Sequence, residues 1–322
     1  MKWDEDATPD MSNVDDQRSS GGRTGGGFPF PFPRGGGSGG SGGGLGLPIG
    51  KGSGILGVVI ALAAVFLLPR LMGGSEGLPF NVEEMNLPGA VPEASGPDGR
   101  VDDAPPTDEA GRFVVWVFND VQRTWAQEFS QSDQQYSDAK LNLFRGSVSS
   151  GCGQASSAMG PFYCPADSEV YIDETFFEEL AGRFGAPGDF AQAYVVAHEV
   201  GHHVQNVLGI SDDVRRLSSQ NPDQANQLSI RLELQADCLA GVWAHSVYTD
   251  DSADRGLEQG DIEEGLGAAA AVGDDRIQEQ ATGRIDPESW NHGSSDQRVK
   301  WFKVGFDGGK AAQCDTFGVD QP

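Results

Sequence analysis

Residues 185–210 read GAPGDFAQAYVVAHEVGHHVQNVLGI and decide the fold of this chain. Apolar residues in this stretch recur at the spacing of an amphipathic α-helix. Asp189, with Gln192 three residues later, is typical of a helix start with a capping box, and Gly209 is typical of a helix end. The sequence therefore predicts a helix over residues 190–208.

Three polar residues of this helix form the pattern of a zinc site. His198 and His202 are four residues apart, so both imidazoles lie on one face and can reach a single metal ion. Glu199 lies about 100° around the helix, where it can reach a water on the metal rather than the metal itself. Polar residues that merely satisfy one another are the weaker alternative, because this pattern rarely arises by chance. We expect His203 to point away from the metal, at the helix surface or behind a ligand.

A second apolar segment supplies further candidates. SIRLELQADCLAGVWAHSVY, residues 229–248, reads as a mostly buried helix. Glu233 and Asp237 are four residues apart on one face of it, among apolar neighbours. Two carboxylates in such a place are costly without a cation or hydrogen-bond donors. A metal ion and a ligating histidine would satisfy both, and a salt bridge to Arg231 or Arg216 is the alternative.

The two helices together resemble a known arrangement. HEVGHHVQ followed by ELQADCLAG is similar to the gluzincin peptidases, and more narrowly to the bacterial family of predicted neutral zinc metallopeptidases. The likeness covers most of the chain, including MKW with SNVDDQR, the Gly-rich stretch, the single apolar span, SGCGQASSAMGPFYCPAD, GDDRIQ and WNHGSSDQRVKWF. It implies a mainly helical α+β zincin-like domain with a small sheet beside the HEVGH helix.

The resemblance also implies roles for individual residues. Zn²⁺ would be held by His198, His202 and Glu233, while Asp237 would orient the ring of a ligating histidine. Related peptidases place a late His or Tyr beside the scissile carbonyl, which implies that His292 stabilises the oxyanion. Capping of the helix that follows is the alternative role for His292.

Two segments ahead of the zinc helix read as strands. KLNLFRGSVSSGCG and SEVYIDETFF show apolar and polar alternation with aromatic residues. The resemblance implies that a strand of this region lies along the substrate cleft and pairs with an extended peptide. Residues 157–163 are the candidates for lining that cleft.

The chemistry that these residues favour is zinc-assisted hydrolysis of a peptide or protein substrate. Zinc lowers the pKa of bound water from about 15.7 toward roughly 7, and Glu199 takes the proton and passes it to the leaving amine. A deformylase or amidase is one rival, but a deformylase would need an upstream Cys ligand. A membrane-tethered binding or assembly factor with a structural zinc is another. Glu199 argues against it, because a structural site needs no base.

Composition limits the part of the chain that can fold. Residues 1–52, rich in Gly, Ser, Pro and Asp, are expected to be disordered, and residues 73–111 read as an extended linker. The peptidase domain is expected over residues 112–318. The formal net charge of -26 excludes a nucleic-acid partner, because phosphate binding needs a basic face.

The uncharged run GSGILGVVIALAAVFLLP predicts one transmembrane helix over residues 53–72. A cleaved signal peptide is the alternative, but a long segment precedes the run and no cleavage pattern follows it. Cations before the run outnumber those shortly after it. This excess predicts a cytoplasmic N-terminus and an extracytoplasmic catalytic domain at the cell membrane.

The predicted location indicates that the 4 cysteines form disulfides, because an oxidising compartment favours them. Four cysteines allow three connectivities. Cys152 and Cys164 flank a short loop and are natural partners, which leaves Cys238 with Cys314. Four free thiols are the alternative.

Overall fold

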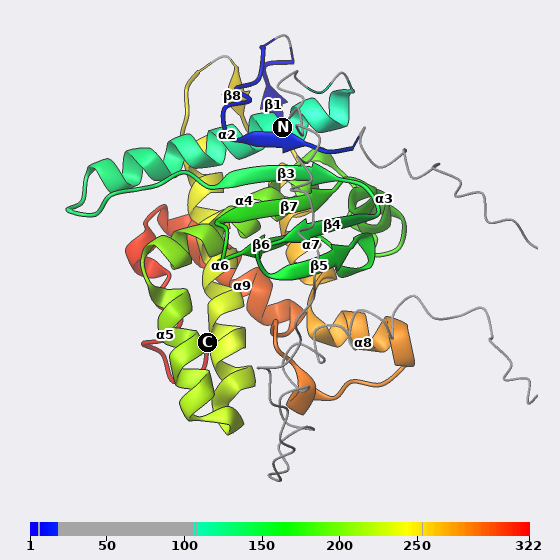
Figure 1. Ribbon diagram of the computed structural model, residues 1–322, viewed down its shortest axis with the longest axis vertical. Coiled ribbons are helices and arrows are strands. Elements are labelled where there is room, and N and C mark those ends of the chain that lie inside the picture. Colours follow the sequence, from blue (N-terminus) through cyan, green and yellow to red (C-terminus); the bar gives the residue numbers. More distant parts are fainter. Residues whose placement is uncertain (6, 19–105, 107, 253) are drawn as a thin grey trace, which may run out of the picture. The chain divides into compact units, whose positions relative to one another are not determined.

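A computed structural model gives the fold and describes residues 1–5, 7–18, 106, 108–252 and 254–322. These residues form a mainly helical α+β domain with small sheets, as the sequence predicts (Figure 1). Three long helices dominate it: α2 (Glu109–Ser130), α4 (Asp189–Val207) and α6 (Ala225–Tyr248). Helix α4 packs against both of the others.

The main sheet has four strands in the order β2 (Val14–Asp16), β3 (Lys140–Phe144), β7 (Glu169–Asp173) and β6 (Phe162–Cys164). The β2–β3 and β3–β7 pairs are parallel, whereas β6 runs antiparallel to β7. Strands β3 and β7 confirm the two predicted strand segments. Because β6 is last in the order, it is an edge strand, and it lies against α4.

Two smaller pairings complete the β-structure of the described residues. A hairpin of β4 (Ser147–Ser150) and β5 (Gly153–Ser156) precedes β6, and β1 (Lys2–Trp3) pairs with β8 (Arg255–Gly256). The shorter helices are α3 (Thr175–Gly182), α5 (Ile210–Gln220), α7 (Asp261–Ala271), α8 (Asp274–Thr282) and α9 (Ser295–Gly308). Single 3₁₀ turns occur at Ser157–Met159, Pro222–Gln224, Pro287–Ser289 and Ala311–Gln313.

Helices α6 and α9 approach each other backbone to backbone. A Cβ atom on Gly305 of α9 would lie 1.9 Å from the Cys238 carbonyl oxygen, and one on Gly241 of α6 would lie 2.1 Å from that of Phe302. Only glycine fits at such a crossing. The close approach brings the start of α9 and the loop before it beside the carboxylates of α6.

Residues 1–5 and 7–18 belong to the folded domain, which corrects the predicted disorder of residues 1–52 for this part. Val14 of β2 and the side chain of Met1 are buried in the main core, and Trp3 packs edge-on against Phe113. The Met1 amine lies 2.6 Å from an Asp189 carboxylate oxygen. Strands of two and three residues are too short for periodicity to reveal them, so their pairing with distant strands could not be predicted.

Arg18 ties the end of this N-terminal segment to the start of the domain. Its guanidinium, almost fully buried, pairs with Asp16 at 2.6 Å, with Asp108 at 3.1 Å and with Glu174. Asp108 caps α2 by accepting a hydrogen bond from the backbone N–H of Gly111. The domain therefore begins before the predicted residue 112.

The zinc helix starts and ends as expected, but its start has a different cause. Gly188, at φ 122°, precedes α4 and has no side chain to cap it, so the predicted capping box is wrong, and the Phe190 N–H in the first turn donates to the Glu264 carboxylate instead. The Asp189 carboxylate binds the Met1 amine instead. Gly209 adopts the left-handed conformation at φ 76°, as its predicted role at the helix end requires.

Both predicted disulfides are confirmed. Cys152 is bonded to Cys164, and Cys238 to Cys314. The predicted span over residues 53–72 and the linker up to residue 105 lie outside the described residues. Within the part of the chain that the structure describes, no helix combines the length and apolar character that crossing a membrane requires.

Candidate metal centre

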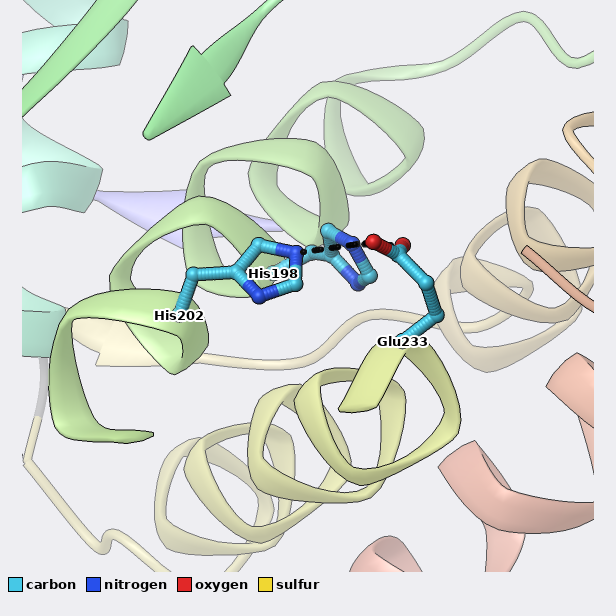
Figure 2. Close-up of side chains that lie close together, drawn as sticks. All are labelled: His198, His202 and Glu233. Carbon is cyan, nitrogen blue, oxygen red and sulfur yellow. Dashed lines mark ion pairs between the residues drawn. The ribbon is translucent and has the colours of Figure 1, made fainter. Parts of the chain in front are cut away.

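Helices α4 and α6 bring the three expected ligands together. His198 and His202 project from α4 and Glu233 from α6, and one ligand atom of each lies within 4.8 Å of the others. The His198 Nε2 atom is 3.3 Å from a Glu233 oxygen, and the His202 Nε2 atom is 3.6 Å from the other. Figure 2 shows the two imidazoles and the carboxylate facing one another.

The electrostatics of Glu233 suit an anionic ligand. Burial opposes its charge, but the positive charge of His202 and hydrogen bonds from both histidines outweigh burial and hold the pKa of Glu233 well below its usual range. The Arg231 salt bridge considered from the sequence does not form. Arg231 instead donates hydrogen bonds to the carbonyls of Val319 and Asp320.

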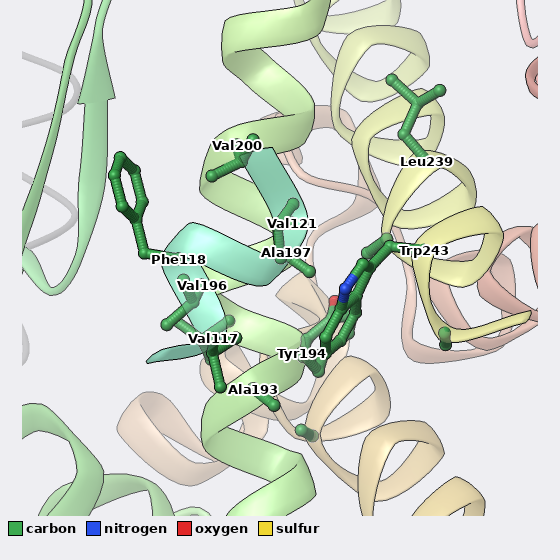
Figure 3. Packing of buried hydrophobic residues seen from close by; sticks show 14 of the residues in the cluster. Val117, Phe118, Val121, Ala193, Tyr194, Val196, Ala197, Val200, Leu239 and Trp243 are labelled. Carbon is green, nitrogen blue, oxygen red and sulfur yellow. The ribbon is translucent and has the colours of Figure 1, made fainter. Parts of the chain in front are cut away.

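The remaining sides of α4 are packed into the core, which fixes the direction of its histidines. Val196 and Val200 lie among residues of α2, while Tyr194 and Ala197 face α6 near Trp243 (Figure 3). Tyr194 and Trp243 are fully buried. A helix held on several sides cannot rotate, so the imidazole positions are set before any metal binds.

The second ring nitrogen of His198 has a fixed partner. Its Nδ1 atom lies 2.9 Å from Asp237, which is fully buried. Arg298, at the start of α9, donates to both oxygens of Asp237 at 2.8 and 2.9 Å, and the Tyr194 hydroxyl also donates to Asp237. Burial alone would raise the pKa of Asp237, but the charges of Arg298 and His198 outweigh it and lower that pKa. The Asp237 carboxylate therefore accepts the Nδ1 hydrogen of His198, and the Nε2 atom of that ring faces Glu233.

His202 is held in the same way by a residue that the sequence reasoning missed. Its Nδ1 atom lies 2.9 Å from the Gln205 side-chain oxygen. The buried Gln205 amide in turn donates to the Leu232 carbonyl at 2.7 Å and to Gln235 at 3.1 Å. The signal that could have found Gln205 is its place three residues after His202 on the same helix.

Glu199 lies beside the triad without being part of it. The residue is 8% exposed, and burial raises the pKa of its carboxyl even though the charges of His198 and His202 oppose that shift. A carboxyl group with a raised pKa exchanges its proton more readily near neutral pH.

His292 comes from the loop before α9 and also approaches the centre. Its Nδ1 atom lies 2.9 Å from Asp274, which accepts hydrogen bonds from the backbone N–H groups of Asn291, His292 and Gly293. Burial alone would lower the pKa of His292, but Asp274 and the charge of Glu233 raise it. Ser294, not His292, caps α9. Asp274 was part of a quoted motif, yet nothing in the sequence indicated that it holds His292.

Comparison with known proteins places this chain in a family. The family model described as "Putative neutral zinc metallopeptidase" matches residues 1–317. The chain belongs to this family. It is 43% identical over 320 residues to the uncharacterized protein YpfJ of Escherichia coli (strain K12), with 99% of each chain covered. It is 47% identical over 220 residues to the uncharacterized protein Rv2575 of Mycobacterium tuberculosis (strain H37Rv), which covers 65% of this chain and 72% of that protein. No solved structure matches.

His203 stays off the metal-facing side of α4, as expected, but it does not lie at the surface. It is fully buried between the rings of Tyr136 and Tyr163, each edge-on at 5.5 Å. A second acidic group, Asp189 with Asp261 and Glu264, also lies close enough to hold a cation. The Met1 amine is the cation there, 2.6 Å from Asp189 and 3.4 Å from Asp261.

Proposed function

We propose that this chain is a zinc-dependent peptidase that hydrolyses peptide bonds with Glu199 as the general base. One observation carries the proposal. His198, His202 and Glu233 converge within 4.8 Å, while the buried Glu199 lies beside them on the same helix and outside the triad. A purely structural zinc site would fill its fourth position with another ligand and would need no such carboxylate.

The donor set fits zinc. Two neutral imidazole nitrogens and one carboxylate oxygen are the ligands of a catalytic zinc that keeps an open position. The Nδ1 atom of each imidazole has a partner outside the triad, so both Nε2 atoms face the Glu233 carboxylate, where a metal ion would bind. When bound, zinc supplies Lewis acidity, which makes a water molecule more acidic and polarises the scissile carbonyl.

The protein's own residues would move the protons. The Glu199 carboxylate takes a proton from the attacking water and gives it to the leaving amine. In its protonated form, which the raised pKa of His292 favours, the ring gives its Nδ1 hydrogen to Asp274 and can offer its Nε2 hydrogen to the developing oxyanion. Asp237 and Gln205 keep the two ligand rings from turning.

Strand β6 is our proposal for where the substrate lies. It is the sheet's edge strand and rests on α4, so its outer N–H and C=O groups can pair with an extended peptide. Residues 157–163, expected to line the cleft, comprise the 3₁₀ turn Ser157–Met159, the two residues after it and the first two residues of this strand.

We also propose that residues 53–72 attach the enzyme to a membrane and that the domain works outside the cytoplasm. The apolar run and the two disulfides support this location. The pairing of β2 with β3 argues against a cytoplasmic N-terminus, because strands on opposite sides of a membrane could not pair.

A screen of peptides by mass spectrometry tests the activity. Glu199→Gln should keep zinc and fold but lower turnover by about 10²- to 10⁴-fold, because only the proton relay is removed. Glu128→Gln, which changes an exposed carboxylate on α2, is the control and should cut like wild type. Full activity of Glu199→Gln would contradict the mechanism. No cleavage by the zinc-loaded wild type would favour the alternative, a membrane-tethered binding or assembly factor.

A further inference from the structure

A chain of hydrogen bonds joins the edge strand β6 to the zinc helix. Tyr163, the central residue of β6, has its hydroxyl 3.1 Å from Nδ1 of His203 and 2.9 Å from the side-chain nitrogen of Asn206. His203 and Asn206 both belong to α4. The other nitrogen of His203, Nε2, lies 2.6 Å from the Ser137 carbonyl oxygen.

The direction of each bond follows from the chemistry of its atoms. A carbonyl oxygen can only accept, so Nε2 of His203 carries the hydrogen toward Ser137. Nδ1 of the neutral ring then accepts from the Tyr163 hydroxyl. The same hydroxyl accepts from the Asn206 amide, which can only donate through its nitrogen. Every group in the chain is satisfied, so the arrangement has one stable geometry.

The position of His203 links this chain to the metal ligands. His203 directly follows His202 in α4, and its buried ring is held by tyrosines on both sides. The Cys152–Cys164 disulfide restrains the far end of β6, and β7 pairs with its inner edge. Tyr163 is therefore the point at which the distance between β6 and the two ligating histidines is set.

We propose that His203 and Asn206 are positioning residues that fix strand β6, through Tyr163, relative to the metal ligands. This inference rests on the proposed function, in which β6 pairs with the substrate backbone. A peptide bond must lie within about 3–3.5 Å of its attacking group to react. If β6 were free to shift, the triad would still bind the metal, but the strand would misplace the peptide.

Tyr163→Phe tests the proposal, because it keeps the ring and removes only the hydroxyl. Tyr136→Phe is a matched control, since the Tyr136 ring also packs on His203 while its hydroxyl donates to Gln122 instead. Two probes distinguish binding at the strand from binding at the metal. Acetohydroxamate binds the metal alone, and a peptide hydroxamate also pairs with the strand.

For zinc-loaded Tyr163→Phe we expect the Kd of the peptide hydroxamate to rise about tenfold, or about 1.4 kcal/mol, because the hydrogen bonds of the hydroxyl with His203 and Asn206 are both lost. The Kd of acetohydroxamate and the zinc content should stay at wild-type values, and so should both affinities in Tyr136→Phe. Unchanged affinity for the peptide hydroxamate in Tyr163→Phe would overturn the proposal. Equal weakening of both probes would also overturn it, because the defect would then lie at the metal.

Amide hydrogen exchange gives a second readout that needs neither substrate nor turnover. Exchange in residues 162–164 should speed up in Tyr163→Phe and in His203→Gln, but not in Tyr136→Phe. Wild-type exchange rates in both variants would refute the positioning role. If the wild type cuts no peptide but the two variants still exchange faster than it does, the proposed function is wrong and the positioning role stands.

Discussion

At the scale of single residues, the Nδ1 atoms of the two histidine ligands already have hydrogen-bond partners. Asp237 and Gln205 fix the two imidazoles, and Arg298 with Tyr194 fixes Asp237. The sequence pattern predicted His198, Glu199 and His202, because helical spacing alone places them. It could not predict Gln205, Asp274 or a role for Arg298, because their contacts depend on how helices and loops pack.

Glu233 and Asp237 should differ in their effect on zinc. Glu233→Ala leaves two histidines and solvent on the metal, so zinc should be lost on dialysis or bound far more weakly. Asp237→Ala keeps all three ligands but removes the hydrogen-bond partner of His198, and with it that of Arg298 and Tyr194, so it should weaken zinc binding about 10- to 100-fold. Metal analysis of dialysed protein measures both.

Glu233→Gln refines this comparison, because it keeps volume and helix propensity but removes the charge. We expect it to lose zinc as Glu233→Ala does. Full zinc in Glu233→Ala, together with loss of zinc in Asp237→Ala or His292→Ala, would place the third ligand elsewhere.

At the scale of elements, the contact between α6 and α9 brings Arg298 to Asp237 and the His292 loop toward Glu233. The sequence predicted α6 and α4 because both are long and strongly patterned. It did not predict α5, whose residues are mostly polar, or the closeness of α9, which depends on two glycines in separate helices.

Gly305→Ala should destabilise the fold by about 1–3 kcal/mol or more, because its Cβ would overlap the Cys238 carbonyl oxygen. Gly267→Ala is the matched control. It also lies in a helix, but nothing lies within 4 Å of its added Cβ, so the change should stabilise by about 0.5–1 kcal/mol. Urea unfolding gives both values. Equal stability of the two variants would mean that α6 and α9 do not pack this closely.

At the scale of the whole molecule, the chain's beginning and its zinc domain form one unit. Residues 1–18 contribute β1, β2, the buried Met1 and the Arg18 ion pairs. Composition predicted disorder for them because they precede a Gly-rich stretch. A few well-placed residues, such as Met1 and Val14, were enough to bury them in a core built elsewhere.

The two parts should therefore share one side of any membrane. Ser12→Cys and Ser130→Cys, both at exposed positions, report on the N-terminal segment and on the domain. In spheroplasts, a membrane-impermeant maleimide should label both variants, because the domain is proposed to work outside the cytoplasm, and labelling of neither would place both parts inside. Labelling of Ser130→Cys with full protection of Ser12→Cys would restore the single crossing with a cytoplasmic N-terminus, and it would mean that β2 does not pair with β3 in the cell.

The position of the metal tests the central claim most directly. Crystals of the zinc-loaded protein, measured on both sides of the zinc absorption edge, should show one anomalous peak. The zinc ion at this peak should be bonded to Nε2 of His198, Nε2 of His202 and a Glu233 carboxylate oxygen. Bond lengths of about 2.0–2.2 Å are expected, with one position left for water. A peak elsewhere, or a fourth protein ligand in place of the water, would contradict the account of this chain as a zinc peptidase.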